Sequence, residues 1–290
     1  MLQEYLTMKF SLWRQYGALN SGPVFEAFRQ GAHALGYDCS DNDPTADIDV
    51  IWSVLFHGRM GGNQRIWEAA KARSKPVLVL EVGGIDRGTT WKVGLNGINR
   101  DANFGDTGND SNRANMLGLK TRAWRTNGEH ILICGQHDKS LQWYNMPRMS
   151  QWVMDTIETI QAHTDRPIIF RPHPRCRLDS IEHQYQNVYR DNPRQITGTY
   201  DDFNLSFNKC HAVINYSSNP GIHSILNGVP AFVGTSSLAY DVGNDIDFIH
   251  DIENPIMPDR EQWLNDYAYT EWTLEEISQG IPLNRLTTRL

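Results

Sequence analysis

The chain has 290 residues, of which 40% are hydrophobic and 10% aromatic, a composition typical of a folded globular protein and not of a disordered one. Its formal net charge of −7 gives no overall attraction to nucleic acid or to an anionic membrane, so a polyanion would need a local basic patch. This length suffices for one large domain or for two of ordinary size.

The first residues contain no basic segment followed by a long apolar one, so we expect no signal peptide. No stretch approaches the roughly 18 apolar residues of a membrane-spanning helix. The four cysteines are widely spaced and form no C-x-x-C pair,. We therefore expect a cytoplasmic protein in a reducing compartment.

In the first part of the chain, apolar runs alternate with helical patterns, which predicts alternating strands and helices. We expect strands at 9–13, 47–56 and 76–84, and helices at 21–36 and 62–74. From Ile85 to Gly128 the pattern dissolves into a segment rich in Gly, Asn, Asp and Arg. That segment predicts a long loop that is functional or mobile.

The alternation resumes after the loop. We expect strands at 130–136, 167–174, 211–218 and 230–234, and helices at 148–163, shortly after 174, directly after 218, at 258–269 and at 273–280. Thr273 and Glu276 have the spacing of a capping box.

Because the strand–helix order occurs twice, the sequence predicts the α/β class, with two Rossmann-like, doubly wound domains that face a cleft. Ligands are then expected at the carboxyl ends of the strands. We place the domains at 1–125 and 126–270, followed by a helical tail at 271–290 that can cross back to the first domain.

The segment NYSSNPG (215–221) puts two serines and an asparagine between a buried strand and a helix that starts near Pro220,. One explanation is ordinary N-capping of that helix. The other is an anion site, because free backbone N–H groups and the helix dipole favour a phosphate. Ser217 and Ser218 would add two hydroxyl donors. Both explanations stay open at this point.

His173 lies between two prolines in FRPHPR (170–175). The prolines remove backbone donors and fix the direction of the chain, so the imidazole points off the strand end, near several arginines. Such a histidine can donate a hydrogen bond or a proton to a departing phosphate. The alternative is a surface turn with solvated arginines. A metal site on His173 and Cys176 lacks further ligands at a suitable spacing.

Glu81 follows a run of apolar strand residues and precedes Gly83 and Gly84, which allow another backbone or a substrate to approach closely. A carboxylate at the end of a parallel strand lies where general bases commonly lie. Asp86 competes for this role. The alternative is a helix cap, or a salt bridge to Arg87.

Taken in order, these segments resemble the motifs of bacterial sialyltransferases and capsule Kdo transferases, which have the GT-B fold. Those families share an acidic pair with glycine, a His-Pro dipeptide and a serine pair before a helix, which correspond to LEVGGI, RPHP and NYSSNPGIHSILNGVP. The segment 131–141 is similar to the start of the second domain in the capsule enzymes, and 258–280 is similar to their C-terminal helices. The likeness covers most of residues 76–280.

The resemblance implies a glycosyltransferase whose first domain binds the acceptor and whose second domain binds a UDP- or CMP-linked sugar. Ser217 and Ser218 would hold the phosphate, His173 would stabilise the leaving nucleotide, and Glu81 or Asp86 would deprotonate the acceptor hydroxyl. The other donor-binding candidates are Arg171, Asn219, Gly221 and His223. We expect neither a metal nor a cofactor. One base without an evident covalent nucleophile predicts inversion at the anomeric carbon.

Two positions depart from the family pattern. The acidic pair is reduced to Glu81-Val82, which leaves open whether Glu81 or Asp86 is the base. A glutamate that often stands in the helix after the serines is replaced by His223, which leaves the sugar of the donor undetermined.

The acceptor has to be inferred from segment 85–128, which interleaves basic and aromatic residues. This combination suits phosphate contacts and base stacking, so we name Arg87, Trp91, Lys92 and Arg100 as acceptor-binding candidates. A solvated lid loop is the alternative, since Asp101, Asp106 and Asp110 dilute the charge.

Compact glycosyltransferases of this kind also resemble phage-encoded enzymes that modify hydroxymethylated pyrimidines in DNA and have to reach a base, for example by flipping it out. We rank this acceptor ahead of a capsule or surface glycan. The protein would then act in the cytoplasm of a bacterial host. A nucleotide-sugar epimerase or a non-catalytic sugar-nucleotide binder is the alternative of another class.

Overall fold

The computed structural model describes residues 8–199 and 201–289. The chain divides into two compact units, which we call unit 1 (8–113 with 266–289) and unit 2 (114–265). These divisions fall at 113/114 and 265/266, whereas the sequence suggested 125/126 and 270/271. The chain therefore returns to unit 1 for its last segment.

Unit 1 contains a six-stranded sheet in the order β12-β5-β4-β3-β1-β2. The strands are β1 (Lys9–Leu12), β2 (Asp38–Asp41), β3 (Ile48–Trp52), β4 (Val77–Val82), β5 (Thr90–Leu95) and β12 (Glu271–Thr273). Strands β4, β3, β1 and β2, which are adjacent in this order, are parallel. Strand β5 is antiparallel to both of its neighbours, β4 and β12. The apolar runs in β3 and β4 are buried, as expected for strands covered on both faces,.

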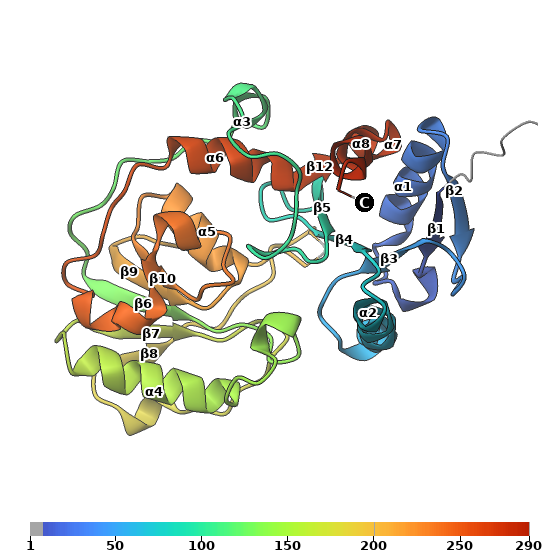
Figure 1. Cartoon of the computed structure of the whole chain (residues 1–290). Coiled ribbons are helices and arrows are strands. Elements are labelled where there is room, and N and C mark those ends of the chain that lie inside the picture. The colour runs from blue at the N-terminus through green and yellow to red at the C-terminus, as the bar shows by residue number, and fades with distance from the viewer. Residues whose placement is uncertain (1–7, 200, 290) are drawn as a thin grey trace, which may run out of the picture. The chain divides into compact units, whose positions relative to one another are not determined.

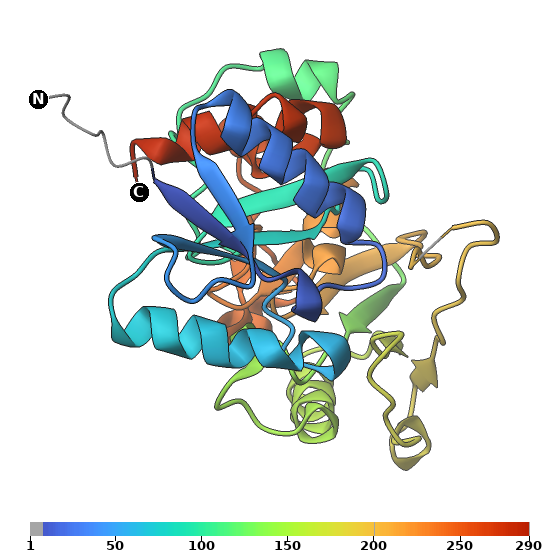
Figure 2. The same ribbon diagram turned by 90° about the vertical axis from the view of Figure 1, so that its right-hand side faces the viewer.

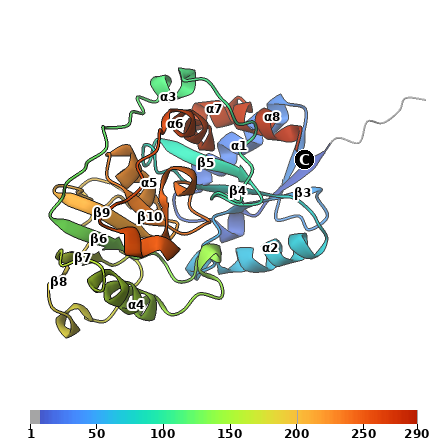
Figure 3. The same cartoon turned by 60° about the vertical axis from the view of Figure 1, so that its left-hand side comes forward.

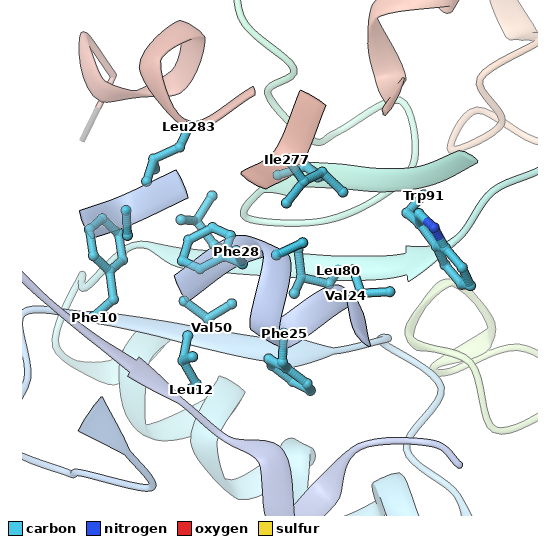
Figure 4. Packing of buried hydrophobic residues seen from close by; sticks show 14 of the residues in the cluster. Phe10, Leu12, Val24, Phe25, Phe28, Val50, Leu80, Trp91, Ile277 and Leu283 are labelled. Carbon is cyan, nitrogen blue, oxygen red and sulfur yellow. The ribbon is translucent and has the colours of Figure 1, made fainter. Parts of the chain in front are cut away.

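Helices cover both faces of this sheet (Figure 2 and Figure 3). One face carries α1 (Gly22–Ala34), α7 (Leu274–Ser278) and α8 (Ile281–Thr287), and the other carries α2 (Asn63–Ala72). Figure 4 shows the core under α1, where Phe25 and Phe28 pack with Phe10, Leu80 and Ile277. The last 20 or so residues thus supply part of the unit 1 core, since burial of apolar area is the main stabilising term.

Unit 2 contains a parallel six-stranded sheet in the order β11-β10-β9-β6-β7-β8 (Figure 1). Its strands are β6 (His130–Cys134), β7 (Ile168–Arg171), β8 (Val188–Arg190), β9 (Cys210–Asn215), β10 (Ala231–Val233) and β11 (Asn244–Asp245). One face packs on α4 (Met149–Gln161). The other packs on α5 (Asn219–Leu226).

Both units are thus Rossmann-like, which confirms the predicted α/β class with two such domains, as in the GT-B fold. The two remaining helices, α3 (Asn112–Met116) and α6 (Glu261–Tyr267), lie where the chain leaves and re-enters unit 1. The predicted capping box is present at the start of α7. In the described part of the chain, none of the helices combines the length and the apolar character that a membrane span requires.

Two expectations about local structure were wrong, and one strand, β2, was not expected. Segment 85–128 is not one loop, because it contains β5 and α3. The sequence pattern hid β5 since Lys92 and Gly94 interrupt its apolar run although the strand is buried throughout. No helix follows residue 174 up to 199; that stretch contains a short 3-10 turn and β8 instead. β2 was not predicted, since its four residues are largely polar.

Candidate functional site

Three neighbouring parallel strands of unit 2 end side by side. Asn215 at the end of β9 pairs with Cys134 at the end of β6, which pairs with Arg171 at the end of β7. The residues that follow are therefore brought to one edge of the sheet, where open α/β sheets bind ligands. We call this group the unit 2 edge; it comprises Gln136, His137, His173, Ser217 and Ser218.

Side chains after β6 connect the serines to the predicted histidine. Oε1 of Gln136 accepts hydrogen bonds from both N and Oγ of Ser217, each at 3.0 Å. The ring of the next residue, His137, meets the ring of His173 edge to face, with centroids 5.5 Å apart. The structure thus brings Ser217 and His173 to one edge, joined by two residues that the sequence analysis did not name.

Ser218 is the N-cap residue of α5, but its side chain makes no capping hydrogen bond within the described part of the chain. Its Oγ instead accepts a hydrogen bond of 2.8 Å from Nδ2 of Asn215, which is fully buried. Because the oxygen of Ser218 accepts this bond, its own proton is left to donate. Ordinary N-capping therefore does not explain the serine pair.

The two histidines are held in the same way. Nδ1 of His173 accepts the backbone N–H of Arg175 at 3.1 Å, and Nδ1 of His137 accepts that of Lys139 at 3.2 Å. A neutral imidazole whose Nδ1 accepts a hydrogen bond carries its proton on Nε2. Each ring is thus oriented by its own loop, with Nε2 as the donor atom.

Arg171, predicted to bind the donor, has another role in the structure. Its buried guanidinium forms an ion pair of 2.7 Å with Asp191 and donates to the backbone carbonyl of Asn204. These contacts tie the loop after β8 to the sheet. They account for Arg171 without a ligand, and its role in donor binding stays a prediction.

The other donor-binding candidates lie on α5. Asn219 is its first residue, and His223 lies half-buried one turn later. A Cβ atom on Gly221 would lie 3.0 Å from Oδ1 of Asn215, so glycine allows the helix to approach the strand end closely. That Oδ1 is buried and has no hydrogen-bond partner among the residues that the structure describes.

In unit 1, Glu81 lies near the end of β4, directly opposite Lys92 of β5. Burial raises the pKa of the Glu81 carboxyl, while hydrogen bonds from Ser53 and from its neighbour's backbone N–H, and the charge of Lys92, lower it. Asp86 lies on the surface in the turn that follows, where its carbonyl accepts the N–H of Thr90. Of the two acids, Glu81 has the environment of a general base.

A second carboxylate of unit 1, separated from Glu81 by Lys92, was missed by sequence reasoning. Glu271 is fully buried in β12, and its carboxylate accepts hydrogen bonds from the N–H groups of Gly84 and Ile85 and from Thr90 Oγ1, at 2.7, 2.9 and 2.7 Å. A Cβ atom on Gly83 would overlap this carboxylate. The glycine pair thus allows close approach, as predicted, but what approaches is Glu271.

The acceptor-binding candidates do not lie together in a loop. Trp91 is 6% exposed and belongs to the apolar core (Figure 4), and Lys92 is 4% exposed. Arg87 is half-buried and Arg100 is exposed. The premise of a mobile basic loop was wrong for Trp91 and Lys92, because both are part of β5. Contact of these four residues with an acceptor stays a prediction.

Other basic and aromatic residues of segment 85–128 have contacts within their own unit. Arg125 donates to the carbonyls of Phe207 and Cys210, and Nε1 of Trp124 donates to the carbonyl of Pro258 at 2.8 Å. These contacts weaken the interpretation of the segment as a surface for phosphates and bases.

No protein-family model matches this chain, and no curated protein matches it. Among solved structures, the β Kdo 2,7 transferase of KpsC from Thermosulfurimonas dismutans has a TM-score of 0.52 at 13% identity, over 96% of this chain and 99% of that chain. This chain shares its fold. The β Kdo 2,4 transferase of KpsC from the same organism has a TM-score of 0.48 at 12% identity, over 91% of this chain and 90% of that chain.

Proposed function

We propose that this protein is a glycosyltransferase that moves a sugar from a nucleotide-sugar donor to a hydroxyl of a glycan. The observation that carries the proposal is the unit 2 edge, where Ser218, the imidazole of His173 and the start of α5 converge at the ends of neighbouring strands. Such an arrangement suits the phosphate of a donor. The shared fold with a solved Kdo transferase supports the same class of activity.

The chemistry follows from these groups. The bond between the anomeric carbon and the phosphate oxygen breaks through an oxocarbenium-like state, and negative charge builds on the leaving phosphate. The hydroxyl of Ser218 and Nε2–H of His173 would stabilise that charge. The acceptor oxygen forms the new bond, and its proton passes to a carboxylate, for which Glu81 is better suited than the exposed Asp86. With one base, inversion at the anomeric carbon stays our prediction.

We now rank a capsule or surface glycan ahead of a 5-hydroxymethylpyrimidine in phage DNA as the acceptor. The DNA proposal depended on basic and aromatic residues in a loop, and Trp91, Lys92, Trp124 and Arg125 are instead engaged within the protein. A glycan acceptor needs no such surface.

The first experiment is a thermal-shift and calorimetric panel of UDP-, CMP- and GDP-sugars with the whole chain. We expect one nucleotide class to bind, and a glycan library incubated with that donor to gain its sugar by mass spectrometry. Release of free nucleotide and isomerised sugar without acceptor would indicate an epimerase instead. Stabilisation by none of the sugar nucleotides would remove the proposal.

The serine pair gives a sharper test with a built-in control. The proton of Ser217 Oγ is already donated to Gln136, whereas that of Ser218 is available. Ser218→Ala should therefore weaken donor binding about 10-fold or more, because a charge-assisted hydrogen bond contributes roughly 1.5–3 kcal/mol. Ser217→Ala should cost less. Equal, small effects in calorimetry would argue against a phosphate at this edge.

A further inference from the structure

Glu81, Lys92 and Glu271 form a row of alternating charge across three strands of unit 1. Glu81 pairs with Lys92 between β4 and β5, and Lys92 pairs with Glu271 between β5 and β12. Residues directly opposite each other in antiparallel strands point to the same face, with Cβ atoms roughly 4.5–5.5 Å apart. Their strand neighbours Trp91 and Trp272 belong to the apolar core. The order of these three side chains is therefore fixed by the pairing of the strands and does not depend on the rotamer of any one residue.

The central ammonium has an unusual environment. Lys92 is 4% exposed, and a buried charge is stable only when opposite charges lie close to it. Burial lowers the pKa of Lys92, while Glu271 and Glu81 raise it. Glu271 is held in place by three donors, so its position beside the lysine is fixed.

We propose that Lys92 keeps Glu81 ionised in the folded protein, and that Glu271 is the counter-charge that keeps Lys92 protonated inside the sheet. Lys92 is then a positioning residue for the base, where the sequence had suggested an acceptor ligand. The inference rests on the proposed role of Glu81, but the coupling between the two side chains can be measured without any substrate.

Other ionisable groups face the same row. Arg87, in the turn after β4, lowers the pKa of Glu81 and that of Lys92, and its effect on Glu81 is smaller than that of Lys92. Tyr267, in α6, lies beside Glu271; burial and then this carboxylate raise the pKa of its hydroxyl well above the ordinary value, so the phenol stays neutral. Lys92 is therefore the cation with the largest effect on Glu81.

The test is a titration of the glutamate side chains labelled with ¹³C at the carboxyl carbon, in which Glu81→Gln identifies the Glu81 resonance. We expect Lys92→Met to move the Glu81 midpoint upward by about one pH unit or more, the usual effect of removing a nearby opposite charge. Lys92→Arg should restore the midpoint in part. Lys120→Met, which removes an exposed charge of unit 2, should leave it unchanged.

A midpoint in Lys92→Met that moves no further than in Lys120→Met would overturn the inference. If Lys92→Met does not fold, judged by circular dichroism, Lys92→Gln and Arg87→Met provide the same comparison, and Arg87→Met should give the smaller shift. An equal or larger shift in Arg87→Met would assign the role to the arginine.

Activity gives an independent readout once the donor is known. The acidic limb of the pH–rate profile should move upward in Lys92→Met by the same amount as the midpoint, whereas a purely structural lysine would lower the rate equally at every pH. Failure of every donor to bind would remove the proposed function, and the titration would still decide whether Lys92 controls Glu81.

Discussion

The two units carry different chemistry near the carboxyl ends of their strands. At the unit 2 edge the groups are mainly hydrogen-bond donors: the hydroxyl of Ser218, the imidazoles of His137 and His173, and the start of α5. In unit 1 the corresponding region holds the charged row Glu81–Lys92–Glu271. Hydrogen-bond donors suit a ligand that brings its own negative charge. Nearby charges suit a catalytic side chain whose protonation state has to be controlled.

The two regions also differ in how the chain builds them. Hydrogen bonds at the unit 2 edge join loops that follow neighbouring strands of one sheet. In unit 1, the bond from Gly84 N–H to Glu271 spans 187 residues of sequence, because β12 returns from the C-terminal segment. The unit 1 region should therefore be far more sensitive to substitutions that loosen this segment.

The largest effect should come from Arg113→Met. The buried guanidinium donates to the carbonyls of Ala268 and Glu271, forms a 2.5 Å ion pair with Glu276 and lies 3.8 Å from the ring centroid of Trp272. Removing one partner of a buried ion pair costs about 3–5 kcal/mol. We expect a loss of that size in urea unfolding of unit 1, followed by tryptophan fluorescence, with little change at the unit 2 edge.

The matched control is Arg29→Met, which removes an ion pair between Arg29 and Asp41 at the surface of the same unit. An exposed pair contributes roughly 0–1 kcal/mol. If the two variants lose equal stability, Arg113 does not anchor the C-terminal segment in the way described.

Paired glycine substitutions compare the two regions directly. A Cβ atom on Gly83 would overlap both the carbonyl oxygen of Thr90 and the carboxylate of Glu271, whereas one on Gly221 would lie 3.0 Å from Oδ1 of Asn215. Gly83→Ala should cost about 1–3 kcal/mol through overpacking. Gly221→Ala should cost less, because the higher helix propensity of alanine offsets part of the strain. A larger loss of thermal stability in Gly221→Ala than in Gly83→Ala would contradict this account.

Much of the fold could be predicted from the sequence because it depends on local patterns. The apolar runs of β3, β4 and β6 and the capping box at Thr273 are visible without knowing any neighbour. β5 was missed because Lys92 inside a buried strand is stable only through its partners on β4 and β12. The pattern of apolar residues predicts which positions are buried. That prediction fails at a position such as Lys92, where a charged side chain is buried together with opposite charges.

The candidate site shows the same limit. Ser217 and His173 could be predicted as candidates because polar residues at the ends of apolar strands stand out. Gln136 and His137 follow a strand in the same way, but their importance depends on β6 lying between β9 and β7, and strand order is absent from the sequence. Glu271 could not be found at all, since its position opposite Lys92 requires the return of the chain to unit 1.

The smallest predicted effect concerns Glu81 and pH. Because burial raises the pKa of Glu81 in the folded protein, the stability associated with its neutral form is complete below the unfolded value and is lost as the pH rises through the folded one. In Glu81→Gln the side chain cannot ionise, so this loss of stability at higher pH does not occur. The glutamine keeps an amide oxygen that accepts the same hydrogen bonds. The variant should match the wild type near pH 4 and exceed it by about 1 kcal/mol near pH 8, a typical size for one substitution.

Thermal denaturation across this pH range measures the difference, with Glu68→Gln on the exposed surface of α2 as the control. A stability gain that is the same at every pH would mean that Glu81 titrates as an ordinary surface carboxylate. A gain that grows with pH in Glu81→Gln alone would assign it to the charge of Glu81. In the Lys92→Met background the growth should begin at the same pH, set by the unfolded chain, but continue to a higher pH and become larger.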